Sequence, residues 1–154
     1  MVWATSGSAI DMGVKDGDII AVGLLASTTV YKGDIVRSTG SAADVRTYCS
    51  SVAAVADYDQ FIGVAIETVV ASAVDNASQV RVSRKKGSIH KFYKATPAYT
   101  DMGAIAYLDV STDPQTVVTT AGTHAIAVGI IVGWDATAGT VDVAINPDTI
   151  EVAA

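Results

Sequence analysis

Clusters of turn-forming residues interrupt this chain from end to end and leave only short apolar segments between them. The C-terminal third shows the pattern most clearly, where STDPQ (111–115), AGTH (121–124) and DATAG (135–139) each separate two apolar segments. Turn clusters at such intervals are typical of a sandwich or a barrel built from many short strands. The spacing therefore favours an all-β architecture.

The amino-acid composition supports the same conclusion. Half of the 154 residues are apolar, but few are aromatic, and Ala, Val and Ile supply most of them. Branched side chains pack well on a pleated sheet and lose side-chain freedom in a helix. Stretches of good helix formers such as Leu, Glu, Lys and Gln are largely missing. We expect an all-β fold, a small β-barrel or barrel-like sandwich, with at most a short helix near 41–57.

The individual strands are predicted from the apolar segments and their alternation. Residues 60–74 and 125–134 are predicted to be buried strands. Residues 78–87 and 88–95 alternate, and we expect them to form a hairpin around a turn at Lys86–Ser88, because Gly tolerates positive φ. Segment 41–57 fits a helix and a strand equally well. The other predicted strands are 18–26, 28–38 with a turn at Gly33, 103–110, 116–120 and 140–146.

The chain also contains a faint internal repeat. KGDIVR (32–37) is followed by IGVAIE (62–67), and MGAIAY (102–107) is followed by VGIIVG (128–133). Each half then closes with an alternating Val-rich strand, VRVSR (80–84) and VDVAI (141–145). We expect two weakly similar halves that curl around a common core into a closed or nearly closed barrel, which removes exposed strand edges. The predicted organisation is an N-terminal arm (1–17), one barrel-like domain (18–147) and a C-terminal tail (148–154).

Residues that carry chemistry are few and scattered. His90 and His124 have no His or Cys at metal-ligand spacing, so we predict no metal site and no cofactor. Cys49 is interpreted as a small buried apolar residue. Asp57 and Asp59 resemble a weak calcium loop, but the closing Glu is absent and a solvated loop explains them better. Phosphate-binding loops and nucleophile elbows are also absent, so we predict a protein that is not an enzyme. A hydrolase using a converging pair of Asp side chains is the alternative.

The N-terminus and the apolar segments bear on localisation. MVWATSGSAID (1–11) lacks the basic and apolar regions of a secretory signal. The longest apolar runs, 19–26 and 125–134, fall well short of the ~20 residues of a membrane helix. A single Cys suits a reducing compartment. We therefore expect a soluble product of the cytoplasm with no membrane partner.

Positive charge is concentrated in one segment, RVSRKKGSIHKFYK (81–94). It holds six of the ten Lys and Arg residues and no carboxylate, although the whole chain has a net charge of −6. One interpretation is a solvated hairpin whose lysines discourage unwanted strand pairing. A second is single-stranded nucleic-acid binding, with Phe92 and Tyr93 stacking on bases, but sixteen acidic residues would repel a polyanion. A third is docking to an acidic protein surface.

An ordered set of motifs narrows these interpretations. KGDIVR (32–37), FIGVAIETV (61–69), VRVSRKKG (80–87), MGAIAYLDVSTDPQTVVTT (102–120) and HAIAVGIIVGWDATAGTVDVAIN (124–146) together resemble the capsid decoration, or cement, proteins of tailed bacteriophages. In that family a Gly-Asp opens an early strand, as Gly33-Asp34 does here, and a Val-rich strand closes the domain. The resemblance covers roughly residues 28–147.

This resemblance implies a small β-barrel-like fold without catalytic residues. It implies trimers on the outer surface of the virion head, which bridge major capsid protein subunits after synthesis in the bacterial cytoplasm. The alternatives are a tail-tube or head-fibre protein and a small-barrel nucleic-acid binder. An N-terminal arm anchored by Trp3 could order on a neighbour. The residues predicted to contact the capsid or a neighbouring protomer are Trp3, Arg81, Arg84, Lys85, Lys86, His90 and Lys91.

Overall fold

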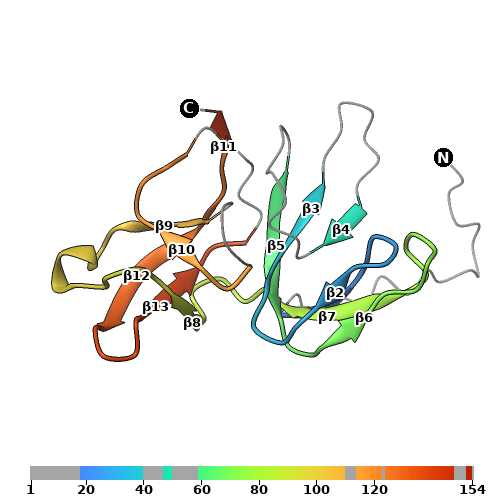
Figure 1. The fold of residues 1–154 in the computed structure, drawn as a ribbon, viewed down its shortest axis with the longest axis horizontal. Helices are drawn as coiled ribbons and strands as arrows, with labels where there is room; N and C mark the ends of the chain where they lie inside the picture. Colours follow the sequence, from blue (N-terminus) through green and yellow to red (C-terminus); the bar gives the residue numbers. More distant parts are fainter. Residues whose placement is uncertain are drawn as a thin grey trace, which may run out of the picture.

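A computed structural model describes residues 18–39, 47–49, 59–109, 114–122, 124–147 and 152–153. The predicted arm (1–17), most of segment 41–57 and most of the predicted tail lie outside these residues. Figure 1 shows two β-rich lobes side by side, with the N-terminal half of the chain in one and the C-terminal half in the other.

Two five-stranded antiparallel sheets form the fold, which confirms the all-β prediction. The first sheet has the order β1 (Ile19–Gly23), β7 (Gln79–Ser83), β5 (Gln60–Ala65), β3 (Ile35–Thr39), β4 (Thr47–Cys49). The second has the order β8 (Ile89–Tyr93), β13 (Thr140–Ile145), β12 (Ala127–Asp135), β9 (Ile105–Leu108), β10 (Val117–Val118). Two short pairs, β2 (Thr29–Val30) with β6 (Val69–Val70) and β11 (His124–Ala125) with β14 (Val152–Ala153), and one 3₁₀ turn, η1 (Tyr99–Asp101), complete the described elements.

The two sheets repeat one another strand for strand. Numbered in chain order within each half, the strands lie in the order 1-5-4-2-3 in both sheets. The register repeats as well: Val36 lies opposite Gly63 in the first half, and Ala106 lies opposite Gly129 in the second. A bulge follows at the same place in each sheet. The faint repeat in the sequence is therefore a repeat of the fold.

Hydrogen bonds at the start of the second strand of each half show how closely the backbones correspond. The Gly33 amide donates to the Ala65 carbonyl at 2.8 Å, and the Gly103 amide donates to the Ile131 carbonyl at 2.8 Å. These four residues take equivalent positions in the aligned registers. Equivalent bonds at equivalent positions mean that the two halves can be compared residue by residue.

The turn predicted within residues 78–95 is present, but the two strands on either side of it do not pair with each other. β7 pairs with β1 and β5 in the first sheet, whereas β8 pairs with β13 in the second. Between them the Ser88 amide donates to the Lys85 carbonyl at 3.0 Å, and Gly87 has a φ of +82°. Val82 of β7 packs in one hydrophobic cluster and Phe92 of β8 in another. The segment is therefore a crossover that joins the two sheets.

Hydrophobic residues gather in two clusters that share the first sheet. The cluster within the first half contains Val22, Val36 and Val82, among others. The second cluster contains the inward side chains of the second half together with Ile35, Phe61 and Val64 of the first half (the others are Phe92, Ala106, Leu108, Val117, Ile126, Val128, Ile131, Val141, Val143 and Ile145). The first sheet is consequently buried on both faces along β3 and β5.

The second sheet curls until its two edges meet at one point. Tyr93 at the end of β8 forms an isolated bridge with Thr116, next to β10, and the Tyr93 amide donates to the Gln115 carbonyl at 2.9 Å. No further ladder between β8 and β10 occurs in the described residues. The sheet is barrel-like without being a closed barrel.

Candidate docking surfaces

Arg81 does not present a free charge. Its Nε and Nη2 atoms donate to Glu67 Oε2 at 3.1 and 3.0 Å, and its backbone amide donates to Glu67 Oε1 at 2.9 Å. Hydrogen bonds from Arg81 hold the pKa of the Glu67 carboxyl below its ordinary value, and the same contact raises the pKa of Arg81. This pair ties β7 to the segment after β5 and removes one cation from the predicted basic surface.

Two lysines of the segment are neutralised in the same way. Lys91 Nζ lies 2.9 Å from Asp142 Oδ1 on the neighbouring strand β13. Lys94 Nζ lies 3.2 Å from Asp101 Oδ2, and both side chains are largely buried. Much of the charge concentrated in the sequence is therefore paired with carboxylates from other parts of the chain.

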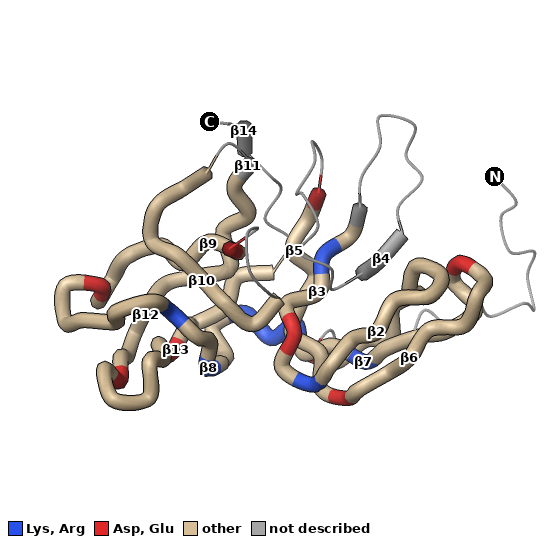
Figure 2. Tube along the Cα trace, viewed as in Figure 1, with Lys and Arg blue, Asp and Glu red and all other residues tan. Residues whose placement is uncertain are grey.

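Lys85 and Lys86 follow Arg84 on the crossover between the sheets, and we name Arg84–Lys86 the basic turn. Lys85 is 66% exposed and lies 3.8 Å from Asp18. Lys86 is exposed, and no carboxylate of the described residues pairs with it. Figure 2 shows this short run of basic residues between the two lobes. Of the residues predicted to bind a partner, these three remain together.

The side chain of His90 supports the basic turn through a hydrogen bond and is not part of its exposed charge. Its Nε2 is 3.1 Å from Ser88 Oγ, and that hydroxyl donates its hydrogen to the Lys85 carbonyl at 2.7 Å. Nε2 must therefore donate to Ser88 Oγ. Burial lowers the pKa of His90. Its contacts bind the turn to β8. Trp3 lies outside the described residues.

Asp59 corrects the expectation of a solvated loop at 57–60. It is 1% exposed and forms an ion pair with Arg37, which is 3% exposed. The pair joins the residue before β5 to β3. Asp57 lies outside the described residues. The acidic residue that resembled a calcium ligand belongs to a buried structural ion pair.

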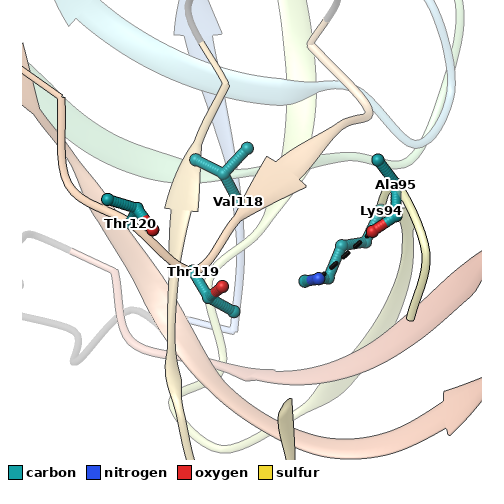
Figure 3. Close-up of a pocket in the computed structure, with 5 residues that line it drawn as sticks. All are labelled: Lys94, Ala95, Val118, Thr119 and Thr120. Carbon is teal, nitrogen blue, oxygen red and sulfur yellow. Dashed lines mark hydrogen bonds between the residues drawn. The ribbon is translucent and has the colours of Figure 1, made fainter. Parts of the chain in front are cut away.

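A hollow of about 280 Å³ is lined by Lys94, Ala95, Val118, Thr119 and Thr120 (Figure 3). Lys94 Nζ donates to the Ala95 carbonyl at 3.2 Å and also pairs with Asp101. The charge of Lys94 is thus engaged by the protein itself, and these lining residues include no carboxylate, His or Cys side chain.

The described residues supply no cluster of three or more His, Cys, Asp or Glu side chains placed to hold a metal ion. Within the same residues, no helix has the length and apolar composition needed to span a bilayer.

The outer face of the second sheet carries exposed apolar side chains that the sequence did not predict, and the Lys91–Asp142 pair lies on the same face. β12 was expected to be buried, but Ile130, Val132 and Trp134 are 42%, 42% and 44% exposed. Because Ala127–Trp134 is apolar on both faces of the strand, the sequence offered no alternation to distinguish them.

One row of side chains crosses this face on four neighbouring strands, and we name it the outer row. The register places Ile130 of β12 beside Ile105 of β9 and Ala144 of β13, and Ala144 beside Ile89 of β8. Ile105 is 43% exposed and Ile89 63%. Contiguous exposed apolar side chains usually mark a protein contact surface.

Comparisons with known proteins identify no relative. No family model matches the sequence, and neither the curated proteins nor the solved structures yield a match.

Proposed function

We propose that this chain is a non-enzymatic structural protein of a phage virion, which binds the outside of the capsid and stabilises the head by bridging major capsid subunits. The observation that carries the proposal is the exposed pair of Lys85 and Lys86 in the basic turn of a chain whose net charge is −6. Such a charge distribution gives the protein one face suited to an acidic partner. We name a capsid as that partner because the ordered motifs resemble those of capsid decoration proteins.

The mechanism rests on rigid presentation and on avidity. The turn is fixed at both ends, because the Gly87 amide donates to the Ile145 carbonyl at 2.8 Å and the Arg84 amide donates to the Asp18 carbonyl at 2.7 Å. A fixed turn loses little conformational entropy when it docks. Several weak contacts per assembly then hold the shell together, since each bound contact raises the effective concentration of the next.

Charge reversal of the basic turn tests this proposal. We expect Lys85→Glu/Lys86→Glu to weaken co-sedimentation with capsid shells of the source phage, most strongly at low salt, where screening is weakest. The matched pair of single variants is Lys86→Glu and Lys32→Glu, because both lysines are exposed and each change alters the net charge equally. Lys32→Glu should bind as the wild type does. Full decoration by the double variant at every salt concentration would refute the proposed contact.

The same samples address the two alternatives. Labelled protein found on tails instead of heads would assign the chain to a tail component. Nucleic-acid binding would appear as an affinity for single strands that falls steeply with salt. That function would need aromatic platforms, but Phe92 is 1% exposed and lies in the core, which leaves Tyr93, at 55% exposed, as the accessible one of the pair.

A further inference from the structure

A lysine stands in the second half where the first half has a buried leucine. Leu24 and Lys94 each follow directly after the first strand of their half, and the registers of β1 and β8 make the two positions equivalent. The Leu24 amide donates to the Ser78 carbonyl at 2.9 Å, and the Lys94 amide donates to the Gly139 carbonyl at 3.1 Å. Leu24 is 0% exposed and belongs to the hydrophobic cluster of the first half. The two halves therefore differ in chemistry at a position where their backbones agree.

Lys94 is largely buried at this position, and an acidic side chain accompanies it. Its side chain is 12% exposed, and its Nζ atom lies 3.2 Å from Asp101 Oδ2. Asp101 is equivalent to Tyr31, since the residue three positions later donates its amide to the carbonyl of each at 3.0 Å. Tyr31 is 57% exposed and uncharged. The second half thus contains a largely buried ion pair at two positions that carry no charge in the first half.

The fold does not need this ion pair for its stability. A buried ion pair loses hydration on folding, and well-packed apolar side chains of similar volume often stabilise a protein equally well or better. The first half shows that the same backbone folds with Leu24 in the place of Lys94. Residues that depart from the local pattern without a gain in packing are expected at functional sites. Lys94 is therefore a candidate for binding a ligand.

Lys94 lines the hollow of about 280 Å³ at one end of the second sheet (Figure 3). The hollow lies beyond the bridge between Tyr93 and Thr116, where the ends of β8 and β10 separate. Lys94 and Ala95 form one of its walls, and residues 118–120 form the other. The open end of a barrel-like sheet is a common place for a small-ligand site. The position of the hollow therefore fits a binding function for Lys94.

The polar groups on these walls can all donate hydrogen bonds. An ammonium group carries three hydrogens, and Lys94 directs one to the Ala95 carbonyl at 3.2 Å and another to Asp101. The third has no acceptor among the residues that the structure describes. The hydroxyls of Thr119 and Thr120 add two further donors. Asp101 does not line the hollow, so a ligand there meets the positive end of the ion pair.

We propose that this hollow binds a carboxylate group, with Lys94 Nζ and the hydroxyls of Thr119 and Thr120 as the donors. Ala95 and Val118 supply short apolar walls, which suit an aliphatic chain next to the carboxylate. The carboxylate belongs either to a free aliphatic acid or to an Asp or Glu side chain of a protein partner, since the recognition chemistry is the same. The inference does not depend on capsid attachment, because its evidence is the comparison of the two halves and the hollow.

Titration of the full chain with propionate, followed through the NMR shifts of backbone amides, tests the proposal. We expect saturable shifts at Ala95 and Thr119, and roughly tenfold weaker binding of the uncharged analogue propionamide. Lys94→Leu/Asp101→Asn should abolish these shifts and still fold, because Leu restores the apolar residue of the first half. Asn keeps an acceptor for the Ala98 amide, which lies 2.8 Å from Asp101 Oδ2. Lys91→Leu/Asp142→Asn, at the exposed pair, is the matched control and should bind propionate as the wild type does.

Two results with the wild type would overturn the proposal, namely the absence of saturable shifts and equal affinities for propionate and propionamide. Shifts that survive in Lys94→Leu/Asp101→Asn would overturn it as well, because the ligand would then use another surface. If that variant fails to fold, Thr119→Val replaces it and should weaken binding by about threefold to tenfold, since one hydrogen bond is lost. An affinity for propionate equal to that of the wild type in Thr119→Val would then contradict the assignment.

Co-sedimentation with capsid shells distinguishes the two sources of the carboxylate. Loss of shell binding in Lys94→Leu/Asp101→Asn, with Lys91→Leu/Asp142→Asn unaffected, assigns the carboxylate to a side chain of the partner. Shell binding equal to that of the wild type, together with loss of propionate binding, assigns the site to a free acid. The charge reversal Lys85→Glu/Lys86→Glu tests the capsid contact separately, so failure of the proposed function and failure of this inference give different results.

Discussion

Gly63 and Gly129 occupy the same position in the two halves, and at both positions a Cβ atom would overlap a backbone carbonyl of the adjacent strand. The carbonyls belong to Ser83 and Ala144, which themselves are equivalent. Each glycine also lies beside the bulge of its sheet. The glycines of IGVAIE and VGIIVG are thus fixed by the close approach of two strands.

Replacing either glycine by Ala should destabilise the protein by about 1–3 kcal/mol, because backbone must move to admit the methyl group. Chemical denaturation measures the change. Gly122→Ala is the control, since a Cβ there meets no atom within 4 Å. Equal unfolding midpoints for Gly129→Ala and Gly122→Ala would contradict the proposed overlap.

The buried pair of Arg37 and Asp59 predicts strongly non-additive mutational effects. Arg37→Met leaves a carboxylate without its buried cation and should cost about 3–5 kcal/mol of unfolding free energy. Arg37→Met/Asp59→Leu should cost much less than the sum of the two single changes, because neither charge is then left alone. Lys91→Met, at an exposed pair, should leave the midpoint nearly unchanged. Additive costs in the double variant would argue against the pairing.

His90 predicts a loss of stability in mild acid. Burial lowers its folded pKa below the ordinary 6.5, so on acidification the unfolded chain binds a proton before the native protein does. Stability therefore falls as the pH drops below about 6.5 and levels off below the folded pKa. His90→Gln removes this contribution. Urea midpoints at about pH 7.5 and pH 5.5 should show the wild type losing more stability than the variant. An identical loss in both proteins would contradict the prediction.

The hydrogen bond from Gln115 to Asp34 allows a prediction of how much polar contacts between the two halves add to the stability of the protein. Gln115→Ala removes the donor to Asp34, a carboxylate that is 1% exposed and also accepts the Tyr31 amide at 2.8 Å. A hydrogen bond to a charged group of this kind is worth about 1.5–3 kcal/mol. Gln79→Ala, at an exposed side chain on β7, serves as the control. Equal thermal unfolding temperatures for the two variants would show that this hydrogen bond adds little to stability.

Much of the fold could be predicted from the sequence, since strands with one wet face alternate and turn clusters delimit them. This alternation correctly identifies Val80 and Val82 in VRVSR (80–84) as buried. The repeat was visible because the bulge and the close approach require glycine at the same place in each half. Alternation gives the face of a strand and not its neighbour, so β7 and β8 were assigned to each other when each belongs to a different sheet.

The candidate site was harder to predict for the same reason. Arg81 and Glu67, or Lys91 and Asp142, are 14 and 51 residues apart in the chain and meet only through register. Charge density along the sequence therefore overstated the basic surface. For β12 the prediction erred in the other direction and underestimated the exposed apolar surface. A strand that is apolar on both faces is predicted to be buried whether or not its outer face is covered.

The cluster shared through Ile35, Phe61 and Val64 has a consequence for biosynthesis. During translation β3 and β5 leave the ribosome before the second half of the chain that will cover them, so this face of the first sheet stays exposed to water until the second half is made. A nascent chain that stalled in that interval would expose this apolar surface, and exposed apolar surface on an incomplete chain favours aggregation. We therefore expect rapid completion of the polypeptide to reduce aggregation during synthesis.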